Sequence, residues 1–404
     1  MILKLIWRNL WRNHRRTLIT TASITFAVLF CILMQSFQKG AFDNLIKNVV
    51  GYYSGYVQIH KNGYWNERVL DNCFELNDSL IQKIQQHPNV LDFVPRLETF
   101  TLASFNNTSK ACLLVGTDPE KEQALTHLND KLIGGSYLQA GDQAVLIAAG
   151  LAKKLNVKLN DTLVLFGQAY QGCLAAGKYK IKGILQLASP EMNNSFVYLP
   201  LKATQDLLNT ENRITTLALI LANPLEKMTL VAELRKQLSS DYEIMDWEEM
   251  MPEISNHIKA DGASFYIFSA VLYLIIGFGF FGTVLMMTAE RKREFGMLIS
   301  IGLKKLNLGL ILLGETILIT FLGVLSGILL SLPLVIYLNR NPIQFTGEMA
   351  KAYEKFGFEP VIPTAVDGTI FLSQASFVLV LTFIIGMYPI WHIHKLDAVK
   401  ALRN

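Results

Sequence analysis

The sequence predicts a membrane protein in which four transmembrane α-helices carry a large α+β extracytoplasmic domain between the first and the second. Of its 404 residues, 51% are hydrophobic and only 17% are charged, whereas soluble globular domains have roughly 25% charged residues. The apolar residues gather in four windows long enough to cross a hydrocarbon core about 30 Å thick. The net charge of +4 gives no reason to expect a nucleic-acid partner.

The four predicted spans are residues 18–37, 265–287, 306–338 and 370–391. We expect the first to be an uncleaved helix rather than a signal peptide, because no small-x-small cleavage site follows it.

Only the third predicted span contains an Asp, Glu, Lys or Arg, namely Glu315. A charge near the bilayer centre costs about 3 kcal/mol, so Glu315 should face protein, and a structural hydrogen bond is favoured over a proton or substrate relay.

The distribution of charge predicts the orientation of the spans. The segments 1–17, 288–305 and the tail 392–404 together carry 13 basic and 3 acidic residues. The large segment 38–264 carries 21 basic and 25 acidic residues, and the short loop 339–369 carries 3 and 4. By the positive-inside rule, both termini and the 288–305 loop are cytoplasmic and the large domain is extracytoplasmic.

The first 17 residues have the pattern of a basic amphipathic helix. Basic residues share one arc at about 100° per residue, and another arc holds Leu3, Ile6, Trp7, Leu10 and Trp11. Such a helix lies flat on a membrane surface. We therefore expect a cytoplasmic elbow over residues 1–17, with Trp7, Arg8, Trp11 and Arg12 against membrane lipid. The alternative is an ordinary basic flank that is not helical.

Segment 38–264 shows strand-like runs interleaved with helical ones, which favours an α+β domain, expected as two subdomains and a stalk. Asn77 is placed to cap a short helix. From Trp247 the sequence predicts a helical stalk, with Pro252 and Gly262 as possible bends.

In the third predicted span, the spacing of Gly323 and Gly327 allows close helix packing.

No catalytic, metal or nucleotide site is indicated by the residue pattern. Residues 172–179 differ from a phosphate loop by one residue, but Tyr179 stands where Ser or Thr would bind magnesium, so a Gly-rich hairpin connection is predicted. The seven His lack metal-ligand spacing. The cysteines predicted outside the membrane, Cys73, Cys112 and Cys173, permit at most one internal disulfide, and the sequence does not select a pair.

The loop at residues 290–302, ERKREFGMLISIG, carries the most specific signal. It resembles the E-R-x-R-E-x-G-x-L-x-x-x-G signature of the FtsX/LolC/MacB permeases, the type VII or mechanotransmission ABC permeases. The resemblance covers the whole chain, down to the ending KLDAVKALR, in which Asp397 and Ala398 replace the usual Asp-Pro pair. The layout is most similar to that of the lipoprotein-releasing members.

This resemblance implies a non-catalytic permease subunit in a bacterial cytoplasmic (inner) membrane. It binds no cofactor itself; ATP and magnesium belong to a separate ABC ATPase, and a second permease copy or a paralogue completes a dimer. The loop would dock the ATPase as a coupling helix. Its expected docking residues are Glu290, Arg291, Arg293, Glu294, Phe295, Gly296, Leu298, Ile299 and Gly302.

Three functions remain open at this point. Lipoprotein release is favoured over efflux with a periplasmic adaptor, because efflux members carry a fused ATPase whereas 17 residues precede the first predicted span here. A membrane receptor or adaptor that works without an ATPase is the alternative from another class.

Overall fold

The computed structural model describes residues 2–12, 14–187, 189–355 and 361–394. The chain divides into two compact units, one formed by residues 1–43, 257–343 and 361–404 and the other by residues 44–256 and 344–360. The expected carboxyl-terminal motif, residues 395–403, lies outside the described residues.

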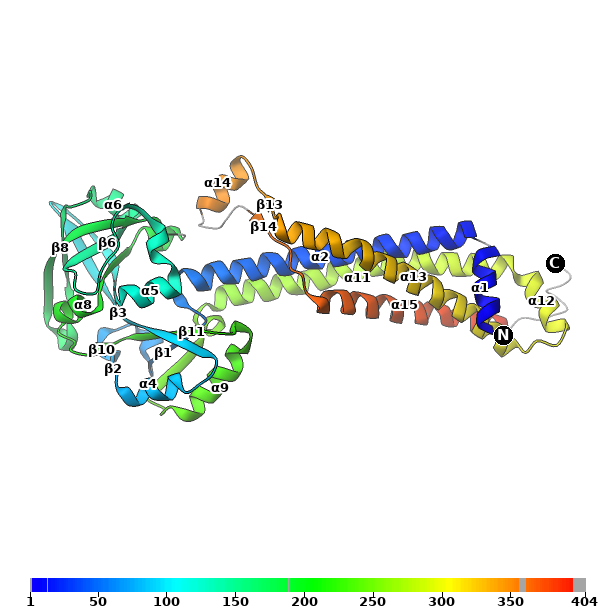
Figure 1. Ribbon diagram of the computed structural model, residues 1–404, viewed down its shortest axis with the longest axis horizontal. Coiled ribbons are helices and arrows are strands. Elements are labelled where there is room, and N and C mark those ends of the chain that lie inside the picture. The colour runs from blue at the N-terminus through cyan, green and yellow to red at the C-terminus, as the bar shows by residue number, and fades with distance from the viewer. Residues whose placement is uncertain (1, 13, 188, 356–360, 395–404) are drawn as a thin grey trace. The chain divides into compact units, whose positions relative to one another are not determined.

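The first unit is a bundle of long helices that run side by side (Figure 1). Four helices in the described part are long and apolar enough to cross a bilayer. They correspond to the four predicted spans. The helices of this unit are α1 (Ile2–Arg12), α2 (His14–Val49), α11 (Pro252–Glu290), α12 (Lys292–Ser300), α13 (Lys305–Arg340) and α15 (Gly368–His394).

Two of these helices extend beyond the apolar windows that predicted them. Helix α2 continues to Val49, because residues 38–49 contain no proline that would end it. Helix α11 begins at Pro252, a residue suited to the first helical position, and Gly262 lies within the helix. The second compact unit therefore starts at residue 44 and its main segment ends at residue 256, instead of the expected 38 and 264.

Close packing of α13 against α2 depends on two glycines. A Cβ atom added to Gly323 would lie 2.7 Å from Ile24 Cβ, and one added to Gly327 would lie 2.8 Å from Val28 Cβ. The close approach also lets Thr25 Oγ1 donate a hydrogen bond of 3.2 Å to the Gly323 carbonyl oxygen. The predicted role of this glycine pair is confirmed.

The second unit is built on a mixed ten-stranded sheet. Strands β4 and β9, and β6 and β8, pair in parallel, and the other pairs of this sheet are antiparallel. The strands of the protein are β1 (Val57–Lys61), β2 (Phe74–Glu75), β3 (Val90–Phe105), β4 (Thr108–Thr117), β5 (Leu132–Gly135), β6 (Ala144–Ala148), β7 (Thr162–Gln168), β8 (Leu174–Leu185), β9 (Phe196–Pro200), β10 (Arg213–Ile214), β11 (Thr216–Leu221), β12 (Tyr242–Asp246), β13 (Ile343–Gln344) and β14 (Val361–Ile362).

Short helices complete this unit. They are α3 (Tyr64–Glu67), α4 (Asp78–Gln85), α5 (Pro119–Thr126), α6 (Ala149–Leu155), α7 (Pro190–Asn193), α8 (Leu201–Leu208), α9 (Lys227–Gln237), α10 (Trp247–Met250) and α14 (Glu348–Lys355). Asn77 caps α4 by accepting a hydrogen bond from the Leu80 backbone N–H at 2.8 Å, as predicted.

Two large hydrophobic cores share the long strand β3. Strands β3, β4, β9, β6, β8 and β7 close into a ring, because β7 pairs with both β8 and β3. Val145, Leu165 and Ile181 are buried in the core of this ring. On the amino-terminal half of β3, strands β1, β11 and β12 extend the sheet, and Leu80 and Leu230 of α4 and α9 are buried against it (Figure 1).

One local prediction for this unit is wrong. Residues 172–179 are not a hairpin connection, because residues from Leu174 onward lie in strand β8 and Tyr179 is buried. The connection between β7 and β8 is the short turn Tyr170–Gly172.

The structure has Cys73, Cys112 and Cys173 as free thiols, of which only Cys173 is exposed.

The glycine contact generates a test of the bundle. We expect Gly327→Leu to lower the free energy of unfolding by about 1–3 kcal/mol, because the new side chain must displace Val28 or the backbone of α2. The measurement is denaturant unfolding of the full chain in detergent micelles. Gly282→Leu in α11 is the matched control, since a Cβ at Gly282 would meet no atom within 4 Å. Equal losses in the two variants would contradict the packing role.

Candidate functional site

The family signature forms a helix–turn segment between two membrane helices. Helix α11 ends at Glu290, α12 spans Lys292–Ser300 and α13 begins at Lys305. Gly302 adopts φ +102°, and its N–H bonds to the Ile299 carbonyl at 3.0 Å while the Leu303 N–H bonds to the Leu298 carbonyl at 3.0 Å. This pair of bonds is a Schellman motif, so Gly302 ends the helix.

One side of α12 is buried within the protein. Phe295 has an exposed fraction of 0% and packs with Leu308, Leu312 and Ile393, with Ile299 partly buried beside them. Gly296 is buried next to Phe295. The expectation that Phe295 and Gly296 contact a partner is therefore wrong, because both are buried within the chain and Phe295 packs α12 against α13 and α15.

The buried carboxylate of Glu315 joins three segments of the chain. Its exposed fraction is 1%. Arg291 Nη1 donates to Glu315 Oε2 at 2.7 Å, and Asn9 Nδ2 donates to Glu315 Oε1 at 2.7 Å. A carboxylate in an apolar helix thus has a cation and an amide as partners, which agrees with the predicted structural role. Arg291 is buried by this contact and is not available to a partner protein.

Two further ion pairs connect the signature to the amino-terminal segment. Arg12 Nη2 donates to Glu294 Oε2 at 2.7 Å, and Arg291 Nε donates to the same oxygen at 3.2 Å. Arg16 pairs with Glu290. Partial burial raises the pKa of Glu294, but the bonds from Arg12 and Arg291 outweigh burial and leave this pKa below its ordinary value. Glu294 therefore stays ionised at neutral pH.

The opposite side of α12 is exposed and carries the residues that remain free for docking. Arg293, Met297 and Ile301 follow each other at intervals of four, so they share one helical stripe. Met297 is 51% and Ile301 78% exposed, and Leu298 borders them. We call Arg293, Met297, Leu298 and Ile301 the docking stripe. The sequence prediction missed Met297 and Ile301, although their spacing from Arg293 could have identified them.

Helix α1 buries one set of its apolar side chains in the protein and exposes another. Ile6 and Leu10 are buried in the core of the bundle, whereas Trp7 and Trp11 are exposed and meet edge to face at 6.2 Å. Helix α1 ends at Arg12, and residues 14–17, expected in the elbow, belong to α2.

The elbow arginines differ in their roles. Arg8 is exposed, whereas Arg12 is held by Glu294 and is not simply a surface charge. The side chains of Leu3 and Lys4 lie outside the described residues.

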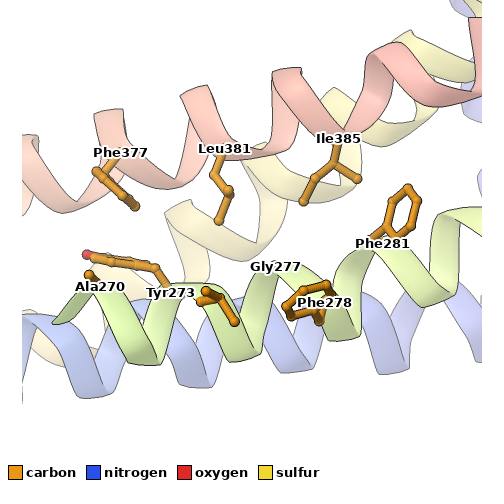
Figure 2. A pocket seen from close by; sticks show the side chains of 9 residues that line it. Ala270, Tyr273, Gly277, Phe278, Phe281, Phe377, Leu381 and Ile385 are labelled. Atoms are coloured by element: carbon orange, nitrogen blue, oxygen red, sulfur yellow. The ribbon is translucent and has the colours of Figure 1, made fainter. Parts of the chain in front are cut away.

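An apolar groove of about 390 Å³ lies between α11 and α15. Figure 2 shows Tyr273 and Phe281 of α11 facing Phe377, Leu381 and Ile385 of α15. The rings of Tyr273 and Phe377 are 4.1 Å apart between centroids. The lining is almost entirely hydrocarbon and aromatic, so the groove is suited to an apolar chain and not to a polar solute.

Two family models match this chain. One, described as the FtsX-like permease C-terminal, matches residues 266–398. The other, described as the MacB-like periplasmic core domain, matches residues 17–238, which is more than half of the chain. The chain belongs to the FtsX/LolC/MacB family of ABC-type permeases. The predicted family and fold class are confirmed, with the MacB-like core domain placed between the first and second spans.

Two similar proteins are distant from this chain in sequence. The chain is 22% identical over 328 residues to "Lipoprotein-releasing system transmembrane protein LolC" of Xylella fastidiosa, a match that covers 78% of each chain. It is 21% identical over 274 residues to an uncharacterized membrane protein of Buchnera aphidicola, a match that covers 64% of each.

Solved structures of outside domains are also similar to part of the chain. The periplasmic region of MacB from Actinobacillus actinomycetemcomitans is 16% identical with a TM-score of 0.37, covering 52% of this chain and 98% of that one. The extracellular domain of YknZ from Gram-positive bacteria is 15% identical with a TM-score of 0.34, covering 48% of this chain and 100% of that one.

Members of this permease family are membrane subunits of ABC transporters and work with ABC ATPases. Together with the four apolar helices, membership makes this chain a multi-pass protein of the inner membrane.

The buried ion pair generates the second test. We expect Arg291→Ala to lower the free energy of unfolding by about 3–5 kcal/mol, because Glu315 would remain buried without its cation. The double variant Arg291→Met with Glu315→Leu should recover most of this loss, since both charges are then removed. Denaturant unfolding of the full chain in micelles measures both. Arg293→Ala, which removes an exposed arginine two residues away, is the control, and a loss as large as that of Arg291→Ala would refute the assignment.

Proposed function

We propose that this chain couples ATP hydrolysis by a separate ABC ATPase to movement of its extracytoplasmic domain, and that the system releases or transports lipoproteins. The docking stripe carries this proposal. Three apolar side chains stay exposed there on a helix that buried contacts hold in place from the other side. An exposed apolar stripe on a fixed amphipathic helix is the surface that inserts into a groove of a partner protein.

The charge distribution supports placing this stripe in the cytoplasm. The segments 1–17 and 288–305 are strongly basic, whereas the large domain is mildly acidic, and basic loops stay on the cytoplasmic side. In this orientation both termini and α12 face the ATPase, which would hold ATP and magnesium. The MacB-like domain then faces the periplasm.

The exposed surface of α11 supports a second permease copy or a paralogue as a further partner. Ile267, Val271, Leu274 and Phe278 are each more than half exposed and recur at intervals of three or four residues. They form a continuous apolar stripe along the helix. In a dimer, two docking stripes would serve two ATPase subunits.

The lipoprotein substrate is supported by two observations. A relative aligned over 78% of this chain is named as a lipoprotein-releasing protein, and the α11–α15 groove is lined for an apolar chain. Efflux with a periplasmic adaptor is the second candidate, because the outside domain matches the MacB-like model. A receptor that works without an ATPase remains the candidate from another class.

Docking is tested by placing a charge on the stripe. We expect Ile301→Asp or Met297→Asp to reduce co-purification with the ATPase, and ATP hydrolysis stimulated by the permease, by about tenfold or more, because a carboxylate would be buried at the interface. Leu225→Asp is the matched control: it changes an exposed leucine of the outside domain in the same way. If the stripe variants stimulate hydrolysis as the control does, docking through this stripe is wrong. If no ATPase co-purifies with the unaltered chain, the receptor function is favoured.

The substrate is tested separately. In cells depleted of this chain, we expect outer-membrane lipoproteins to accumulate in the inner membrane, as measured by membrane fractionation and immunoblotting. Loss of resistance to exported toxic compounds with normal lipoprotein sorting would favour efflux instead.

A further inference from the structure

A second apolar groove is formed by helices α1, α2 and α13. Its volume is about 430 Å³. Helix α1 contributes Trp7 and Trp11, α2 contributes residues from His14 to Phe26, and α13 contributes Leu322 and Leu330. These three helices leave a hollow between them, and the hydrogen bond from Asn9 to Glu315 joins α1 to α13 directly.

The shape and lining of this groove fit one hydrocarbon chain. The lining from His14 to Phe26 follows α2 for roughly 18 Å at 1.5 Å per residue. Leu18 and Phe26 are exposed at its margin, so the groove opens sideways, toward the region that lipid occupies around a spanning helix. Two tryptophans stand at one end, and this residue is typical of the level of lipid head groups.

Some arginines of α1 and of the start of α2 form ion pairs within the protein and others do not. Arg12 and Arg16 are bound to Glu294 and Glu290. Arg8 and Arg15 are exposed, and within the described residues neither forms an ion pair. At about 100° per residue, Arg15 falls on the same face of α2 as Ala22, seven residues later, which lines the groove. An exposed positive charge therefore stands at the head-group end of an apolar groove.

We propose that this groove binds one acyl chain of an anionic phospholipid, in the leaflet next to the amino-terminal helix, with the head-group phosphate at Arg15. The bound chain fills the space between α1, α2 and α13. An anionic head group is favoured over a zwitterionic one, because a free arginine near a membrane surface attracts net negative charge. This site is separate from the α11–α15 groove and does not depend on the identity of the transported substrate.

Lipid retention tests the acyl-chain part of the site. The full chain is purified in detergent with a mixture of phosphatidylglycerol and phosphatidylcholine, and retained lipid is counted by native mass spectrometry. We expect one phosphatidylglycerol per chain in the unaltered protein and its loss in Ala22→Trp, which fills the groove. Ser23→Trp adds the same side chain at the next, exposed position and should retain the lipid. Retention by Ala22→Trp equal to that of Ser23→Trp would overturn the site.

The head-group part is tested by removing one charge. We expect Arg15→Gln to reduce the preference for phosphatidylglycerol over phosphatidylcholine by about fivefold, and Lys292→Gln, which removes a positive charge outside the groove, to leave it unchanged. An unchanged preference in Arg15→Gln would overturn the assignment of the phosphate to this arginine.

A spectroscopic measurement keeps the proposal testable if Ala22→Trp does not fold. Brominated phosphatidylglycerol added to phosphatidylcholine vesicles that contain the full chain should quench tryptophan fluorescence at low mole fraction. In the variant Trp7→Phe with Trp11→Phe, we expect the quenching at low mole fraction to be lost and only the weaker quenching of Trp391, which is exposed on α15 to bulk lipid, to remain. Equal quenching by brominated phosphatidylcholine would overturn anionic selectivity. A groove covered by a second copy of the chain would also overturn the proposal, and it would appear as a smaller oligomer in Ala22→Trp without loss of lipid.

Discussion

The contact between Glu315 and Arg291 is the constraint on which the end of the helix bundle that carries α12 depends. A carboxylate inside an apolar helix is costly unless it is paired and hydrogen-bonded. Arg291 can reach Glu315 only if the chain folds back after α11, and this return places Phe295 in the core beside α13. With Phe295 inward, Met297 and Ile301 face outward. One buried pair therefore sets which side of α12 is exposed.

The same pair ties the amino-terminal helix to the signature segment. Asn9 binds the second oxygen of Glu315, and Arg12 and Arg16 bind Glu294 and Glu290. A force applied to α12 would reach α1 through Arg12 and Glu294 and α13 through Arg291 and Glu315, whereas α2 is joined by Arg16 to Glu290 at the end of α11. The glycine contacts of α13 with Ile24 and Val28 continue this rigid connection deeper into the bundle. Members of this permease family work with ABC ATPases, and these contacts would transmit such a force through the bundle.

The extracytoplasmic domain is stabilised by strand pairing. Its ring of strands closes on itself through β7, and closure removes unpaired strand edges that would otherwise pair with other chains. The long strand β3 belongs to both large cores of this unit. The family model identifies the domain as a MacB-like core, but the fold does not by itself select lipoprotein release or efflux, because one fold can serve several functions.

The sequence by itself determined the four spans, the position of the large domain and the family. These depend on features that are local in the chain: the length of apolar windows, the distribution of charge, and the signature at residues 290–302. The sequence also identified the Asn77 cap and the glycine pair of α13, because capping and close packing use fixed spacings.

Only the tertiary structure decided which signature residues are structural and which are exposed. Arg291 and Phe295 are residue types that suit a docking surface. They are buried instead by Glu315 and Ile393, which lie far along the chain. Asn9 meets Glu315 across 306 positions, a pairing that no pattern in one sequence reveals. Burial is a property of packed neighbours, so the sequence could propose the coupling helix, whereas its exposed face was fixed by the buried carboxylate on the next helix.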